Sequence, residues 1–187
     1  MLNVASVISS SVTRRTGVLI LLAAFVPAVA QQGYKKPPQD VLDVLTAAVT
    51  PTVSVSPAHD TMLLATDLRY PPIADLAQPM LRLAGLRINP NSNGPHRYQY
   101  AVALSLKRIN DGSEIKIELP PGAKIGAPQW SGDGKQFAFT NTTGSGIELW
   151  VGDSASGKVR KLRAIAINAV EGDPFQWMPD NRTLLVP

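Results

Sequence analysis

The serine closest to a catalytic pattern is Ser154, in the stretch Gly152-Asp153-Ser154-Ala155-Ser156. A serine hydrolase commonly needs Gly-x-Ser-x-Gly on a sharp strand-to-helix turn, with an acid and a histidine later in the chain. Here the second glycine is replaced, and the pattern predicts a β-turn with no helix after it. His59 and His96 both precede the serine. We therefore predict no catalytic residue in this chain.

Residues that could bind a metal or a cofactor are sparse. His59 and His96 are far apart in sequence, with no His-x-x-x-His motif or acidic cluster beside them, and cysteine is absent. The stretch Gly144-Ser145-Gly146 lacks the lysine of a phosphate-binding loop. The sequence predicts no metal and no cofactor, and we interpret His59 as a turn residue.

Two sets of side chains are candidates for substrate contact. The first could pair with an acidic substrate side chain, with solvated strand residues as the alternative; it consists of Arg82, Arg87 and Arg97. The second could stack on sugars, although its repeated positions favour packing between sheets; it consists of Trp130, Trp150 and Trp177. Neither set identifies a substrate site, so the substrate-binding residues stay unknown.

The first thirty residues are typical of a secretory signal peptide. Arg14 and Arg15 precede an uncharged apolar run of ten residues, Gly17–Val26, which is too short to span a bilayer. Ala28-Val29-Ala30 predicts cleavage before Gln31, with a membrane anchor or a twin-arginine signal as alternatives. Cleavage lowers the formal net charge from +4 to +2, and no aromatic-interleaved basic stripe indicates nucleic-acid binding. We expect an exported protein, periplasmic or extracellular, without a stable membrane anchor after cleavage.

The rest of the chain divides into a leader with a short helix, 31–51, and an all-β part, 52–187. Apolar residues in one stripe predict the helix, with Pro51 ending it. Short alternating runs separated by Gly, Pro, Asn and Asp then predict strands. The predicted strands are Thr52–Val55, Met62–Thr66, Leu81–Asn89, Tyr98–Arg108, Glu114–Glu118, Gln136–Thr140, Ile147–Gly152, Lys158–Leu162 and Thr183–Val186.

An internal repeat organises these strands. The stretch Gln129–Phe139 recurs 47 residues later at Gln176–Val186, and a weaker copy lies 75 residues earlier, where Met62 and Leu64 stand in place of Phe137 and Phe139. Turn residues that tolerate a left-handed conformation recur in register; they are His59, Gly134 and Asn181. A second half-repeat at an offset of 45 residues matches Leu104, Leu106, Gly112 and Ile117 to Leu149, Val151, Gly157 and Leu162.

Four short antiparallel strands in about 40–50 residues are typical of one blade of a β-propeller. We predict a blade with an insertion at 52–120, a regular blade at 127–165 and the start of another at 173–187, with the insertion at roughly 68–97. The fold class is therefore all-β, a partial propeller of about two to three blades. A β-sandwich with chance similarity is the alternative.

The blade pattern has a family resemblance. Trp130-Ser-x-Asp-Gly-Lys followed by Ile147-Glu-Leu-Trp-Val-x-Asp153 resembles the repeats of exported TolB-like proteins and of prolyl-oligopeptidase-family serine peptidases. Tyr70–Ala77 and Met80–Pro95, with Tyr34-x-Lys-Pro-Pro38, look like the N-terminal propeller region of the glutamyl-endopeptidase-like branch. The resemblance implies a propeller that limits access of peptides to a C-terminal α/β-hydrolase domain carrying the catalytic Ser, Asp and His.

Two functions follow as expectations. One is a truncated, non-catalytic N-terminal part of an exported serine peptidase, with peptides as the substrates of the full-length enzyme. The other is a stand-alone periplasmic TolB-like module for binding or scaffolding. In either case open blade edges favour self-association, because an unpaired apolar edge recruits other chains.

Overall fold

The computed structural model describes residues 35–96, 99–163, 165 and 167–187. The predicted signal peptide, its cleavage site, Tyr34, Arg97 and Tyr98 lie outside these residues. The chain divides into two compact units at Ala47/Ala48. In the part of the chain that the structure describes, no helix has the length and apolar character to cross a membrane.

The first unit contributes one described helix, α2 (Gln39–Thr46), with the acidic Asp40 in its first turn. None of its residues is buried, and the apolar side chains of Val41, Val44 and Leu45 are exposed. The helix was predicted to run to Pro51 but ends at Thr46. Ala47 already has an extended backbone (ψ 144°). The β-branched Val49 and Thr50 and then Pro51 follow, and a helix is disfavoured there because the residue before a proline avoids the helical region.

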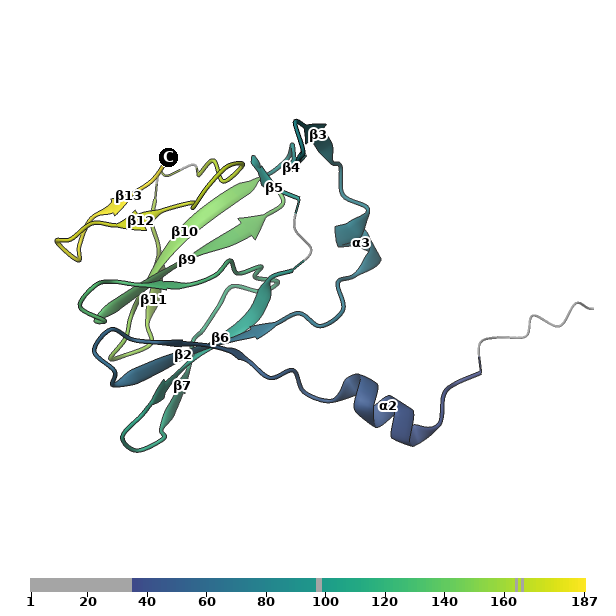
Figure 1. Cartoon of the computed structure of the whole chain (residues 1–187), viewed down its shortest axis with the longest axis horizontal. Coiled ribbons are helices and arrows are strands. Elements are labelled where there is room, and N and C mark those ends of the chain that lie inside the picture. The colour runs from purple at the N-terminus through teal and green to yellow at the C-terminus, as the bar shows by residue number, and fades with distance from the viewer. Residues whose placement is uncertain (1–34, 97–98, 164, 166) are drawn as a thin grey trace, which may run out of the picture. The chain divides into compact units, whose positions relative to one another are not determined.

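The second unit is built from antiparallel sheets (Figure 1). The first sheet has the order β1-β2-β6-β7, with β1 (Thr52–Val55), β2 (Thr61–Asp67), β6 (Ala101–Arg108) and β7 (Glu114–Lys116). The second has the order β8-β9-β10-β11, with β8 (Gln129–Trp130), β9 (Gln136–Thr143), β10 (Gly146–Asp153) and β11 (Val159–Lys161). A third begins with β12 (Gln176–Trp177) paired to β13 (Leu184–Leu185).

These three sheets follow one another through two hydrophobic clusters. Phe137 and Phe139 of β9 pack toward Leu63, Leu104 and other residues of the first sheet. The opposite face of the second sheet packs toward the third, through the cluster Ala138, Ile147, Leu149, Val151, Ile167, Ala169 and Phe175, with Trp177 and Leu184 against it. Figure 1 shows β9 and β10, in green, between the blue and teal strands of the first sheet and the yellow strands of the third. The chain is thus all-β, with the architecture of a partial propeller, as the sequence predicted.

The repeat correctly predicted the backbone of the turns. His59, Gly134 and Asn181 all have positive φ, at 57°, 70° and 57°. A left-handed residue is therefore used at the same place in each repeat, and the interpretation of the exposed His59 as a turn residue agrees with its geometry.

A smaller sheet and a short helix lie in the chain between β2 and β6. They are α3 (Ile73–Leu76), β3 (Leu81–Leu83), β4 (Leu86–Asn89) and β5 (Gly94–Pro95), with the order β3-β4-β5. The single strand predicted over Leu81–Asn89 is wrong: it is a hairpin. The chain reverses at Ala84 and Gly85, which both take positive φ (47° and 89°), and Ala84 gave no turn signal in the sequence.

Candidate functional site

A pocket lies where the ends of the first two sheets meet the segment between β2 and β6. It encloses about 500 Å³. Its walls come from three places: the segment around Asn89 and His96, the loop before Ile125, and the β9–β10 hairpin around Asn141 and Glu148. Segments distant in sequence thus form one concave surface, the usual character of a ligand site.

One wall is fixed by a cluster of Asp75, Lys124 and Tyr100. Lys124 Nζ lies 2.5 Å from Asp75 Oδ1, and Tyr100 Oη donates to Asp75 Oδ2 at 2.7 Å. The ammonium group also stands 5.2 Å from the centre of the Tyr100 ring, within cation–π range. Since Asp75 belongs to α3, this cluster ties the inserted segment to the loop before Ile125.

The titration of this cluster follows from its contacts. Burial tends to raise the pKa of Asp75, but the hydrogen bonds from Lys124 and Tyr100 outweigh it and lower that pKa below its ordinary value. Burial and the adjacent Asp75 carboxylate raise the pKa of Tyr100 to about 12. At neutral pH Asp75 is therefore ionised and Tyr100 is a neutral phenol.

The opposite wall is organised by Glu148 of β10. Its Oε2 accepts hydrogen bonds from Asn141 Nδ2 at 3.0 Å and from Trp150 Nε1 at 2.9 Å, and its Oε1 lies 2.7 Å from Lys161 Nζ. Burial opposes ionisation, but the bonds from Lys161, Trp150 and Asn141 prevail and lower the pKa of Glu148. Glu148 is thus a fixed anion whose oxygens are already engaged.

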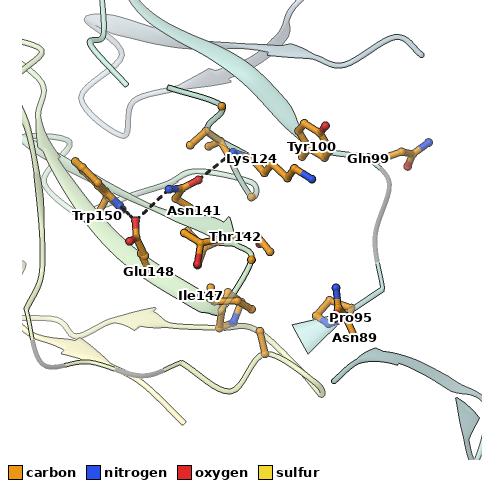
Figure 2. A pocket seen from close by; sticks show the side chains of 18 of the residues that line it. Asn89, Pro95, Gln99, Tyr100, Lys124, Asn141, Thr142, Ile147, Glu148 and Trp150 are labelled. Atoms are coloured by element: carbon orange, nitrogen blue, oxygen red, sulfur yellow. Dashed lines mark hydrogen bonds between the residues drawn. The ribbon is translucent and has the colours of Figure 1, made fainter. Parts of the chain in front are cut away.

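Asn141 joins the two walls. Its side-chain oxygen accepts from the backbone N–H of Lys124 at 2.9 Å while its amide group donates to Glu148. Figure 2 shows Asn141 between these two residues, with Asn89 and Pro95 across the pocket. Asn141 begins the sequence Asn141-Thr142-Thr143, which formally matches a glycosylation sequon. Its side chain is buried (5% exposed), so the acceptor nitrogen is committed inside the fold.

The third wall offers hydrogen-bonding groups. Asn89 Nδ2 donates to Gln78 Oε1 at 2.6 Å. His96 Nε2 is buried, with no hydrogen-bond partner among the residues that the structure describes. The charged groups of the pocket are thus paired internally, Lys124 with Asp75 and Glu148 with Lys161. The arrangement suits an uncharged, hydrogen-bonding ligand better than an ion.

The sequence candidates for chemistry do not converge on this pocket, except for His96, Gly144 and Trp150. Ser154 lies in the turn between β10 and β11, where its backbone N–H donates to Lys135 O at 3.0 Å, and a strand rather than a helix follows. Arg82 and Arg87 are exposed and directly opposite each other in the β3–β4 hairpin. Arg97 lies outside the described residues.

The tryptophans pack, as the repeat indicated. Trp130 meets Phe137 edge to face with ring centres 5.9 Å apart, and Trp150 stacks on Phe139 at 6.2 Å. Trp177 lies against the cluster between the second and third sheets. Their rings are therefore engaged in the joints between sheets.

Sequence reasoning missed the polar residues that shape the pocket, chiefly Asp75, Tyr100, Lys124 and Glu148. Asp75 and Lys124 are 49 residues apart, so no local spacing connects them. The pair Glu148 and Trp150 did carry a signal, because residues two apart in a strand point to the same face.

Comparison with known proteins places the fold in context. No family model matches the chain. It is 34% identical over 172 residues to a probable chloroplastic glutamyl endopeptidase of Oryza sativa subsp. japonica, covering 84% of this chain and 18% of that protein. It is 35% identical over 167 residues to its counterpart in Arabidopsis thaliana, covering 82% and 17%. Among solved structures, acylaminoacyl peptidase of Pyrococcus horikoshii matches with a TM-score of 0.42 and 20% identity over 74% of this chain and 17% of that one.

The repeated sheets make this chain a partial β-propeller, which defines its structural class. The two curated relatives are peptidases by name, and their similarity supports a relation to peptidases of the prolyl-oligopeptidase family. The chain spans less than a fifth of the length of these relatives.

Proposed function

We propose that this chain is the N-terminal, non-catalytic propeller part of an exported serine peptidase. The observation that carries the proposal is the identity of 34–35% to two glutamyl endopeptidases over 167–172 residues. The two successive four-stranded sheets also support it, because a propeller is built from such sheets. The catalytic step belongs to an α/β-hydrolase domain outside these residues.

In this proposal the propeller acts by restricting access. A rigid ring beside an active site admits extended peptides and turns away folded proteins, so the selection is steric. The pocket contributes surface rather than chemistry, because its ionised groups are already paired with each other. An uncharged peptide backbone is the kind of ligand that its remaining amide and imidazole groups suit.

The first experiment treats the purified protein with a fluorophosphonate probe, which labels activated serines, and with a set of short peptides. We expect no labelling and no turnover. Ser154 lies in the turn between β10 and β11, and both histidines precede it in the sequence, whereas the hydrolase order places the histidine after the serine. Labelling of this chain that is lost in Ser154→Ala would contradict the proposal.

The second experiment reads the coding sequence after codon 187 and expresses any longer product. We expect an in-frame Gly-x-Ser-x-Gly, one labelled serine, and cleavage of short peptides but not of the same sequence within a folded protein. A stop codon followed by an unrelated gene, together with capture of a protein partner, favours the TolB-like scaffold instead. Equal cleavage of the peptide and the folded substrate would eliminate the gating role.

Export is tested separately by N-terminal sequencing of the secreted protein. We expect a start at Gln31 or within two residues of it, from the order of charged, apolar and small residues. A start at Met1, or beyond Tyr34, would refute it.

A further inference from the structure

Strand β11 forms an open edge of the second sheet. The strand order is β11-β10-β9-β8, and β10 is the only strand that pairs with β11 in the part of the chain that the structure describes. The second sheet is also the one with a neighbouring sheet against each of its faces. The open edge of β11 therefore follows from the strand order within this sheet and not from the sheets stacked on it.

The backbone of β11 leaves hydrogen-bonding groups on this edge. The carbonyl of Lys158 and the N–H of Leu162 both bond to β10, at 3.0 Å and 2.8 Å. In an antiparallel pair, residues alternate between bonding to the partner strand and pointing away from it. Val159 and Lys161 occupy the alternate positions between these two residues, so their N–H and C=O groups point away from β10. No described residue outside the strands bonds to them.

The side chains of the same stretch are strongly basic. Four of six consecutive residues are cationic, none is acidic, and all four cations are exposed: Lys158, Arg160, Lys161 and Arg163. Among the residues that the structure describes, Lys161 alone of the four has an ion-pair partner, Glu148, at 2.7 Å. The edge therefore combines unpaired backbone groups with three cations that have no ion-pair partner within the described chain.

The charge on an edge strand decides which chains can pair with it. A second copy of β11 would set four cations against four, and like charges opposite each other destabilise paired strands. A nucleic acid supplies negative charge but cannot form a ladder of backbone hydrogen bonds. An acidic, extended polypeptide segment gains both the ladder and opposite-charge pairs, so it complements this edge best.

We propose that β11 is a docking strand for an acidic, extended segment of a partner protein. The segment lies beside β11 as an added strand, and its backbone bonds to the outward groups of Val159 and Lys161. Its carboxylates pair with the exposed cations, chiefly Lys158, Arg160 and Arg163. The proposal is independent of peptidase activity, since none of these residues lines the pocket of about 500 Å³.

The test uses a short, fluorescently labelled peptide that alternates glutamate and valine, with both ends blocked. Its control has the same sequence and charge, but every backbone nitrogen is methylated, so it can donate no backbone hydrogen bond. Fluorescence anisotropy with the purified, unaltered protein at neutral pH and low salt measures both affinities. We expect the unmethylated peptide to bind at least about 10-fold more tightly, because at least two backbone bonds are lost in the control.

Two substitutions at Lys161 separate the backbone from the charge. Lys161→Pro and Lys161→Gln remove the same cation, but only proline also removes an N–H from the open edge. Proline is tolerated at such a position because no ladder bond to β10 is lost. We expect Lys161→Pro to weaken binding of the acidic peptide about 2- to 10-fold more than Lys161→Gln does, the range of one net hydrogen bond.

The contribution of charge is measured with Lys158→Gln and Arg160→Gln combined in one variant. We expect binding to weaken about 3- to 10-fold, as for the loss of two exposed ion pairs. Arg82→Gln, which removes an exposed cation from the β3–β4 hairpin, is the matched control and should bind as the unaltered protein does.

Several results overturn the proposal. Equal binding of the methylated and unmethylated peptides, or equal losses for Lys161→Pro and Lys161→Gln, means that no strand is added to β11. Unchanged binding by the Lys158→Gln, Arg160→Gln variant places the contact elsewhere. A single-stranded oligonucleotide of equal charge that binds as tightly as the peptide identifies a general surface for polyanions, and a peptide that does not bind refutes the docking strand. If Lys161→Pro does not fold, the comparison of the two peptides on the unaltered protein decides the same question.

Discussion

The first and second sheets derive from the same repeat, yet they are buried to different degrees. Phe137 and Phe139 of β9 are 0% exposed, whereas Met62 and Leu64, at the equivalent positions of β2, are only half-buried. The second sheet has a neighbour on each face, while the first has a described neighbour on one. Burial in this fold is therefore a property of the neighbours as much as of the sheet's own sequence.

The burial patterns along the strands show the same contrast. Strand β2 alternates between buried and half-buried residues, as expected of a sheet with one covered face. Strand β9 has five consecutive buried residues, as expected of a sheet with two covered faces.

The largest effect is expected from Phe137→Ala. The ring lies against Trp130 and Phe139 with no exposed surface, so its removal leaves a cavity that costs about 3–5 kcal/mol of unfolding free energy. Chemical denaturation followed by tryptophan fluorescence measures this. Met62→Ala, at the equivalent position of the first sheet, should cost less than half as much; an equal loss would remove the distinction between the two sheets.

The next effect concerns the close approach of β10 to the same ring. A Cβ on Gly152 would lie 2.1 Å from Phe137 Cζ, so Gly152→Ala forces the ring to move and should cost about 1–3 kcal/mol. Adding Phe137→Leu should recover part of this loss, because the two positions are coupled. Gly144→Ala, where no atom lies within 4 Å of the added carbon, is the control; additive losses in the double variant would contradict the steric explanation.

A smaller, pH-dependent effect is expected from Asp75→Asn. The pKa of Asp75 is lowered in the folded protein from 3.8, so its ionised form stabilises the fold above that pH and the contribution disappears as pH falls through the folded pKa. We expect Asp75→Asn to lower the unfolding free energy at pH 7 by about 1.5–3 kcal/mol, the range of hydrogen bonds to charged groups. The difference from the wild-type protein should shrink below pH 3.8.

Unfolding curves between pH 2.5 and 7 measure that difference. Glu171→Gln, an exposed carboxylate, serves as the matched control and should follow the wild-type profile. A loss for Asp75→Asn that stays constant down to pH 2.5 would show that Asp75 is not ionised in its cluster.

The smallest effect is expected at the joint between the second and third sheets. Asn181→Gly keeps the left-handed backbone (φ 57°) but removes the bond to the Asp133 N–H, and should cost about 0.5–1.5 kcal/mol. Asn181→Ala also strains the turn and should cost more. If the alanine variant is as stable as the glycine variant in thermal unfolding, the conformation of the turn does not matter.

The sequence predicted the parts of this fold that rest on repetition. Two features recur at fixed offsets: the tryptophan contacts between sheets, and the left-handed turns at His59, Gly134 and Asn181. Because they recur, the structure of one copy predicts that of the next. The hairpin at Ala84 was missed because nothing repeats it and alanine is not a turn residue. The pocket was missed for a similar reason, since Asp75, Tyr100 and Lys124 meet only through the tertiary fold.

The central claim is that each sheet is protected by the sheets on either side of it. Amide hydrogen exchange, read peptide by peptide on the native protein, tests it most directly. We expect β9 and β10 to exchange most slowly, β2 and β6 faster, and β1, β12 and β13 fastest, because local opening is easiest where burial is least. Exchange in β12 and β13 as slow as in β9, or protection of β2 equal to that of β9, would contradict the account.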